Sequence, residues 1–457
     1  MESADNTTTK LGHVSHLECL NCGEKYSLDR LKNEQGSILV NVCYDICLGP
    51  LDIKYDYDKI KKILTKEELN KRPDTFWKLK ELLPVNEIKV APNRSFTPLV
   101  KSKLIGKELG IELYFKLDCD KSLPTRSFKD RPITLAFNKA LEDGYKTVYV
   151  ASTGNLAIAT AYQAKKLGIK TYAYIPRSLG KLKKDAIRKY LGKEEKLFEL
   201  PLSYDDCNIT SMKDCDKSNE KELKRGGGKT SFVPNNSFRP YYKEGSKTSG
   251  FEIGLQLRDL KVEGPVHVVY PLGSGALFCS AHKGFKELSM LGLTNHKMYM
   301  WGIQPEECSP IVDAIGKEYI TPVKNPKTIA KSIAIGKPGS GHQSLEVMKE
   351  SKGGGFKVGE EEILKSNLDL YFKEGIFSQF VGGTTLAGIK KAVKLGVFKP
   401  NEIVVANITG TGYNRIEDDL LDISKLYGFE SEAKQIIKEV NQDGKNKNSD
   451  TVAEIYK

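Results

Sequence analysis

The stretch Lys121-Ser-Leu-Pro-Thr-Arg-Ser-Phe-Lys-Asp-Arg-Pro132 decides how the rest of the chain is interpreted. It follows an expected strand at residues 113–117 and precedes an expected helix, so Lys129 stands at the mouth of that helix. A second cation, Arg131, lies two residues further on, and a neighbouring cation can lower the pKa of an amine. A neutral amine can attack a carbonyl carbon and form a Schiff base. The alternative is a solvated surface lysine, which is common for this residue type.

Length and composition describe a globular chain. Its 457 residues are 39% hydrophobic and 28% charged, enough for more than one compact unit. No apolar run could span a membrane, and residues 1–10 lack a signal-peptide core, so we expect a cytoplasmic protein with no membrane partner. The net charge of +12 could indicate nucleic acid, but the lysines are spread along the chain among acids. We therefore expect a solvated lysine-rich surface and no nucleic-acid partner.

The nine cysteines favour reduced thiols or a metal site over disulfides in an intracellular protein. Four of them form two close pairs, Cys19 with Cys22 and Cys43 with Cys47, 20 residues apart. Two thiol pairs on facing hairpin turns have the geometry of a tetrahedral structural zinc site. The spacing favours zinc over the alternative, a small β-unit without metal.

Two strand–turn–helix patterns predict ligand-binding turns. The first has a strand at 147–151, the turn Ser152-Thr-Gly-Asn155, and a helix at 156–167, followed by a strand at 171–175. Open α/β sheets bind ligands at such turns, because backbone N–H groups and a helix N-terminus converge there. The alternative is an ordinary loop in which Asn155 caps the helix.

The second pattern has a strand at 266–270, the turn Gly273-Ser-Gly-Ala276 and a helix at 277–291. A turn without bulky side chains lets backbone amides close around a phosphate. A third strand at 403–406 leads into Thr409-Gly-Thr-Gly412. We also expect helical segments at 58–69, 76–83 and 99–109, and exposed loops at 213–229 and 351–360.

The motif Ser127-Phe-Lys-Asp-Arg131 resembles the pyridoxal-phosphate lysine motif of threonine synthases. These belong to the fold type II family, together with threonine dehydratases and cysteine synthases. The resemblance covers roughly residues 91–425, the size of a two-part α/β unit. Further motifs match in the family's order: Thr97-Pro-Leu99, Ala151–Asn155, Glu244–Thr248, Pro271–Gly275, Glu374-Gly-Ile376 and Thr409–Gly412.

The resemblance implies an α/β fold with two open α/β subdomains and the cofactor in the cleft between them. A zinc-ribbon-like β unit at 1–57 and a helical connector at 58–90 precede a catalytic domain at 91–440. A smaller subdomain at about 123–229 is inserted in that domain. A polar tail follows at 441–457.

The resemblance also implies roles for individual residues. Lys129 carries the pyridoxal phosphate and shuttles protons, Asn155 bonds the ring hydroxyl oxygen, and Thr409 lies at the pyridine nitrogen. For Thr409 the alternative is a turn hydroxyl that bonds its own backbone. The cofactor phosphate is assigned to Gly273, Ser274, Gly275 and Ala276. Ser152 and Thr153 are expected to bind the substrate carboxylate. The substrate phosphate is assigned to Arg239, Lys247 and Thr248.

Several positions depart from the family's pattern. Arg126 stands where a glycine is expected, Tyr242 where an arginine is expected, and Gln379 where a glutamate is expected. The asparagine loop continues with Leu156-Ala157 where Thr-Gly is usual. Cofactor-side positions therefore match better than substrate-side positions.

The leading hypothesis is a homodimeric threonine synthase that converts O-phospho-L-homoserine and water into L-threonine and phosphate. β-Replacement on O-phosphoserine, as in a cysteate or cysteine synthase, is the first alternative. Deamination of threonine or serine is the second. From another class, the ribbon and the positive charge could mark a nucleic-acid-binding protein with an inactive enzyme body. Salt-sensitive binding to DNA or RNA would favour that reading.

Overall fold

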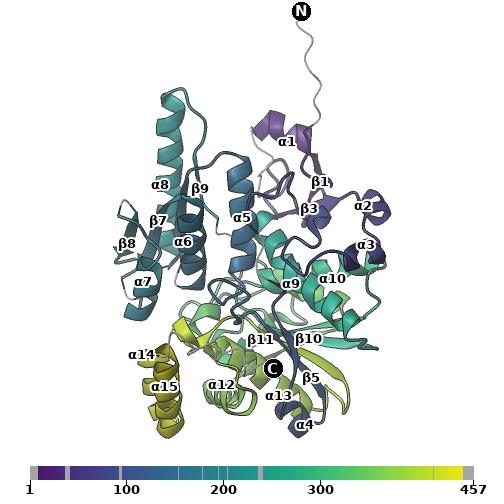
Figure 1. Ribbon diagram of the computed structural model, residues 1–457, viewed down its shortest axis with the longest axis vertical. Coiled ribbons are helices and arrows are strands. Elements are labelled where there is room, and N and C mark those ends of the chain that lie inside the picture. Colours follow the sequence, from purple (N-terminus) through teal and green to yellow (C-terminus); the bar gives the residue numbers. More distant parts are fainter. Residues whose placement is uncertain are drawn as a thin grey trace, which may run out of the picture.

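The computed structural model describes residues 9–35, 42–91, 95–152, 154–177, 179–193, 195–202, 204–234, 240–414 and 416–445. Within these residues the strands form three sheets, with orders β2-β1-β3, β12-β11-β10-β13-β5-β4 and β8-β7-β6-β9. Figure 1 shows the last sheet with α5–α8 at the upper left, the β10-containing sheet below, and the N-terminal sheet at the upper right.

The larger α/β half is built on a sheet that is parallel except for its edge strand β4. The central strand β10 (Val266–Pro271) carries apolar side chains on both faces, so helices must cover both sides of the sheet. Val268 and Tyr270 pack in one core cluster, whereas Val269 packs in another with residues of α12 and α13. The strands are β4 (Leu99–Lys101), β5 (Glu112–Leu117), β10 (Val266–Pro271), β11 (Met298–Pro305), β12 (Gly354–Val358) and β13 (Ile403–Ile408). The helices are α4 (Ile105–Leu109), α9 (Pro240–Asp259), α10 (Ala276–Met290), α11 (Gly341–Glu350), α12 (Glu360–Glu374) and α13 (Phe380–Lys394).

The smaller half is an all-parallel sheet, as expected for consecutive βα units. Its first unit follows the sequence pattern closely, and Gly168 ends α6 in the left-handed region at φ 67°. The strands are β6 (Thr147–Ala151), β7 (Lys170–Pro176), β8 (Lys196–Leu200) and β9 (Ser231–Phe232). The helices are α5 (Asp130–Glu142), α6 (Asn155–Leu167), α7 (Lys181–Arg188) and α8 (Tyr204–Lys224).

The N-terminal unit is a small antiparallel sheet; Cys19 ends its strand β1, and the other three paired cysteines lie in the loops beside it. The four sulfur atoms all lie within 4.8 Å of one another, and Cys22 and Cys43 are 3.8 Å apart. A tetrahedral four-thiolate zinc site with bonds of about 2.3 Å requires sulfurs roughly 3.8 Å apart. The cluster is therefore compatible with a zinc ribbon. The elements are β1 (Val14–Cys19), β2 (Lys25–Ser27), α1 (Leu28–Gln35) and β3 (Leu51–Tyr55), followed by α2 (Tyr57–Ile63) and α3 (Lys66–Asn70).

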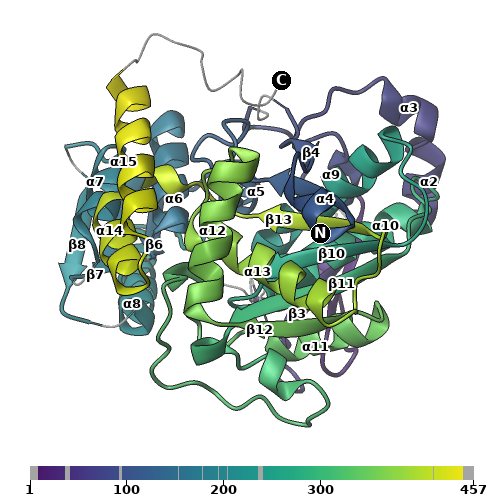
Figure 2. The same cartoon turned by 90° about the horizontal axis from the view of Figure 1, so that it is seen from below.

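The last described segment is a pair of helices, α14 (Ile416–Leu426) and α15 (Glu430–Lys445). Figure 2 shows α15 standing beside α12, and Tyr371 on α12 donates a 2.5 Å hydrogen bond to Glu439 on α15. α15 thus extends past residue 441, where the polar tail was expected to begin. None of the helices in the described residues combines the length and the apolar character that crossing a bilayer requires.

Three secondary-structure expectations were wrong, and the helix expected at 76–83 is reduced to turns and one 3₁₀ turn at Lys80–Leu82. Residues 99–101 form edge strand β4 against β5, so the helix starts only at Ile105. The expected loop at 351–360 contains β12, an edge strand of the large sheet.

The third wrong expectation was the loop at 213–229, because α8 continues to Lys224. The buried stripe of α8 recurs every fourth residue but consists of small or polar side chains, which a search for apolar periodicity passes over. Its members are Cys207, Ser211, Cys215 and Asn219.

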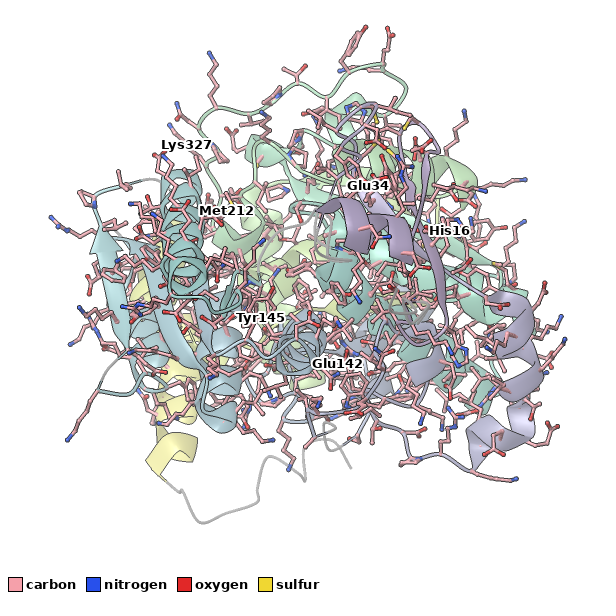
Figure 3. All side chains as sticks on the ribbon, turned by 90° about the horizontal axis from the view of Figure 1, so that it is seen from above. His16, Glu34, Glu142, Tyr145, Met212 and Lys327 are labelled. Carbon is pink, nitrogen blue, oxygen red and sulfur yellow. The ribbon has the colours of Figure 1, made fainter. Side chains whose placement is uncertain are left out.

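The expected mixed surface charge agrees with the distribution of polar side chains. In the view of Figure 3, nitrogen and oxygen tips are interspersed over the whole outline of the molecule. Many lysines pair with nearby acids, for example Lys286 with Glu350 at 2.6 Å.

Candidate active site

Lys129 lies at the start of α5. The loop before it is held in place by hydrogen bonds from both side-chain and backbone groups. The carboxylate of Asp130 accepts hydrogen bonds from the backbone N–H and the hydroxyl of Thr125, at 2.8 and 2.9 Å. The backbone N–H of Phe128 donates to the carbonyl of Thr409 at 3.0 Å. The loop before Lys129 is thereby tied to the turn that follows β13.

The pKa of Lys129 is lowered to about 7 by burial of its amine, and not by a neighbouring cation. The sequence suggested Arg131 as the cause, but that side chain is fully buried and ion-paired. Its guanidinium lies 2.7 Å from Asp118 and 2.6 Å from Glu252. These carboxylates neutralise its charge, so the low pKa of Lys129 follows from the loss of bulk water around the amine.

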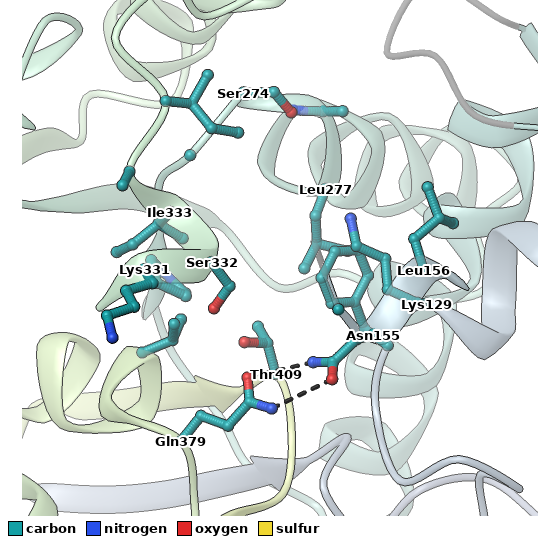
Figure 4. Close-up of a pocket in the computed structure, with 18 of the residues that line it drawn as sticks. Lys129, Asn155, Leu156, Ser274, Leu277, Lys331, Ser332, Ile333, Gln379 and Thr409 are labelled. Carbon is teal, nitrogen blue, oxygen red and sulfur yellow. Dashed lines mark hydrogen bonds between the residues drawn. The ribbon is translucent and has the colours of Figure 1, made fainter. Parts of the chain in front are cut away.

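A cavity of about 270 Å³ opens in front of Lys129. Ligand pockets have roughly 300–1,000 Å³, so this one suits a small molecule. Figure 4 shows it walled by Asn155 from one half and by Ser274, Gln379 and Thr409 from the other. The cavity brings together eight of the residues selected from the sequence: Lys129, Ser152, Asn155, Gly273, Ser274, Gly275, Ala276 and Thr409.

The turn between β10 and α10 fits a phosphate group. Gly275 has φ 84°, and an added Cβ would lie 2.2 Å from Ser344 Oγ, so only glycine fits there. Gly275 has no side chain to cap α10, and Ser274 Oγ accepts only a long 3.4 Å hydrogen bond from the backbone N–H of Ala276. The first backbone N–H groups of a helix lack intrahelical partners, and at this helix they belong to residues that line the cavity.

The amides of Asn155 and Gln379 pair across the cavity. Asn155 Nδ2 donates to Gln379 Oε1 and Gln379 Nε2 donates to Asn155 Oδ1, both at 3.2 Å. Figure 4 shows the two bonds as dashed lines between side chains from opposite halves. Gln379 is thus the hydrogen-bond partner of Asn155, the residue expected to bind the cofactor ring.

The structure does not bring Lys247 and Thr248 to this cavity. Lys247 is fully buried between Glu244 and Glu287, at 2.5 and 2.8 Å. Thr248 donates to the carbonyl of Gly245 at 2.8 Å. Lys247 points toward Glu287 on α10, whereas the Thr248 hydroxyl accepts a 3.2 Å hydrogen bond from Arg131, so neither side chain lines the cavity. Thr153 and Arg239 lie outside the described residues.

Three features of the cavity were not assigned from the sequence. Gln379 and Tyr242 stood out there only as departures from the family's pattern. The wall at 331–335 had no sequence signal, since it belongs to an irregular segment with one 3₁₀ turn at Lys331–Ile333. Lys331 stands there, on the side opposite Lys129 (Figure 4).

Taken together, the two halves enclose a cavity that contains a buried lysine amine and a glycine turn at a helix N-terminus. Residues 90–410 match the model of the pyridoxal-phosphate dependent enzyme family, and the chain belongs to that family. The fold is therefore that of the type II pyridoxal-phosphate enzymes, and the cofactor is pyridoxal phosphate.

Relatives over most of the chain are threonine synthases. That of Methanosarcina acetivorans is 36% identical over 398 residues, covering 86% of this chain and 91% of that one. That of Methanocaldococcus jannaschii is 34% identical over 399 residues with the same coverage. That of Bacillus sp. is 31% identical and covers 78% of this chain and 96% of that one.

Solved structures support the fold. A threonine deaminase of Solanum lycopersicum has TM-score 0.58 at 22% identity, covering 82% of this chain and 89% of that one. Maize serine racemase has TM-score 0.55 at 18% identity, covering 73% and 93%. At these identities the likeness concerns the fold alone.

Proposed function

We propose that this chain catalyses the threonine synthase reaction, in which O-phospho-L-homoserine and water yield L-threonine and phosphate. The observation that carries the proposal is the similarity to two archaeal threonine synthases over 91% of each of their chains. Because that similarity takes in 86% of this chain, it extends well beyond the cofactor motifs. The reaction makes the protein a carbon–oxygen lyase that acts on a phosphate ester.

The proposed roles follow the positions of the side chains. Lys129 bonds the cofactor through Nζ and, when released, holds and moves protons at Cα and Cβ of the substrate. Pyridoxal phosphate, when bound, supplies an electron sink. Asn155 orients the ring hydroxyl and Thr409 the pyridine nitrogen, while the Gly273–Ala276 turn holds the phosphate.

The substrate needs a second anion site. Ser152 lines the cavity and is proposed to bind the substrate carboxylate. Among the described lining residues the lysines are Lys129, which is assigned to the cofactor, and Lys331, so Lys331 joins Arg239 as a candidate for the substrate phosphate. Thr153 and Arg239 are proposed on the sequence alone.

Phosphate release by the purified holoenzyme tests the reaction. With O-phospho-L-homoserine we expect one phosphate released per L-threonine formed, measured by phosphate assay and amino-acid chromatography. O-Phospho-L-serine with sulfite or sulfide, and L-threonine or L-serine alone, are the comparison substrates. Turnover confined to O-phosphoserine with a sulfur nucleophile would replace the proposal by β-replacement. Keto-acid formation alone would replace it by deamination.

Three further proposals concern the protein outside this cavity. The four N-terminal cysteines are proposed to hold one structural zinc ion; the proposal is supported by their paired spacing and by sulfur atoms that lie within 4.8 Å of one another. The cytoplasmic location and the homodimer are proposed from the sequence. Gel filtration of the purified chain at micromolar concentration tests the homodimer.

A further inference from the structure

The hydroxyl group of Tyr242 lies within hydrogen-bond distance of Lys129 Nζ. Its oxygen lies 2.5 Å from that atom, Tyr242 lines the cavity, and only 6% of the residue is exposed. Tyr242 comes from the first turn of α9, a different element from the one that carries Lys129. The contact therefore depends on how α9 packs against α5.

Gly245 lets the two helices come close enough for this contact. A Cβ added at Gly245 would lie 2.6 Å from Pro132 Cα and 2.8 Å from the carbonyl oxygen of Arg131. No side chain fits between the backbones there, so α9 passes directly against the start of α5. Tyr242 lies three residues earlier on α9, within reach of the neighbouring Lys129.

The other ionisable groups around Lys129 are engaged elsewhere. Asp130 accepts from Thr125, and Arg131 pairs with Asp118 and Glu252. On α9, Lys243 donates to Gln343 at 3.3 Å. Lys331 stands on the opposite wall of the cavity.

The remaining close neighbour of the amine is the ring of Phe128, whose centroid is 4.2 Å from Nζ. Among the described residues, the Tyr242 hydroxyl is thus the polar group within hydrogen-bond distance of the amine.

We propose that Tyr242 is a positioning residue that holds the free Lys129 amine while the amine carries protons. A phenol hydroxyl accepts an N–H from an ammonium group and donates its own O–H to the lone pair of a neutral amine. It therefore keeps Nζ in place in both protonation states. Burial raises the pKa of the Tyr242 hydroxyl, so it stays neutral and loses no proton itself. The inference rests on Lys129 as the cofactor lysine, not on the identity of the substrate.

Tyr242→Phe in the full-length enzyme tests this role. The pH dependence of the rate at which apoenzyme captures pyridoxal phosphate reports the protonation of Lys129 without any substrate. We expect its midpoint to fall by about one pH unit, because the ammonium form loses the stronger, charge-assisted hydrogen bond. With the proposed substrate, kcat should fall about 100-fold, the lower end for lost acid–base assistance, with little change in KM.

Tyr241→Phe is the matched control. Tyr241 is also buried, but its hydroxyl has no hydrogen-bond partner among the described residues, so both measurements should equal wild type. An unchanged midpoint and kcat in Tyr242→Phe would overturn the inference. So would a Tyr242→Phe protein that fails to fold where Tyr241→Phe folds, because the hydroxyl would then serve stability. A shifted midpoint in an enzyme that makes no threonine would leave the inference standing and overturn the proposed function.

Discussion

Asn155 and Gln379 hold each other by two reciprocal hydrogen bonds across the cavity. Asn155 begins α6 in the smaller half, and Gln379 immediately precedes α13 in the larger half. A Cβ at Gly410 would lie 3.0 Å from Asn155 Nδ2, so this glycine leaves room for the pair. Each amide N has two hydrogens, so Asn155 keeps one donor for a ligand.

Gln379→Glu should weaken cofactor binding. An ionised glutamate can accept from Asn155 Nδ2, but it cannot donate to Asn155 Oδ1 and repels that oxygen. Losing a hydrogen bond of this kind costs about 1 kcal/mol, so we expect roughly a fivefold rise in the Kd for pyridoxal phosphate, measured by fluorescence titration. Gln442→Glu, on the exposed face of α15, is the control. Equal Kd values for the two variants would show that the Asn155–Gln379 hydrogen bonds do not contribute to cofactor binding.

Lys129 should carry the cofactor. Borohydride reduction of the holoenzyme followed by peptide mapping should locate the adduct on Lys129, and Lys129→Ala should lose the absorbance of the bound cofactor. Capture of the cofactor requires the neutral amine, so its rate should rise with pH and reach half its maximum near pH 7, where burial places the pKa. An adduct on Lys331, the other lysine of the cavity, would contradict the assignment.

Gly275→Ala should impair both stability and cofactor binding. The added methyl group would collide with Ser344 Oγ at 2.2 Å in a backbone conformation with φ 84°. Gly264→Ala separates the two causes, because Gly264 has φ 96° but no atom within 4 Å of the added Cβ. We expect a loss of about 1–2 kcal/mol in unfolding free energy for Gly264→Ala, with normal cofactor affinity. A Gly275→Ala protein with normal affinity would show that the turn does not hold the phosphate.

Lys247→Met should destabilise the fold without a specific effect on substrate binding. It removes the cation that Glu244 and Glu287 share. Glu244 keeps Lys283 at 2.6 Å, but the buried carboxylate of Glu287 loses its ion-pair partner, which costs about 3–5 kcal/mol in urea unfolding. Lys286→Met, in an exposed ion pair with Glu350, should cost at most about 1 kcal/mol. A large rise in KM for O-phosphohomoserine in a stable Lys247→Met enzyme would restore its substrate role.

The cysteine cluster should contain about one zinc ion per chain, measured by metal analysis of protein purified without chelators. Removal of the metal should lower the Tm, because the small N-terminal sheet then loses its cross-link. Cys22→Ser should reproduce that loss. The absorbance of the cofactor should persist, since the cluster lies outside the cavity. Metal-free protein with the same Tm would make the ribbon a unit held by packing alone.

The sequence by itself determined the two α/β halves and eight of the residues that meet at the cavity. Local patterns sufficed for β6, α6, β10 and α10, because apolar periodicity and a closing glycine depend on neighbours in the chain. The turn at Gly273–Ala276 could likewise be predicted to be a ligand-binding turn, because it lies between a strand and a helix.

Only the tertiary structure decided which charged and polar side chains face the cavity. Lys247 and Tyr242 lie five residues apart on α9, yet one is buried among carboxylates and the other meets Lys129. Arg126 occupies φ 53° where the family's glycine is expected, a backbone conformation that its sequence alone does not indicate. Ion pairs and contacts between helices join residues that are far apart in the chain, so their partners are set by packing of whole elements.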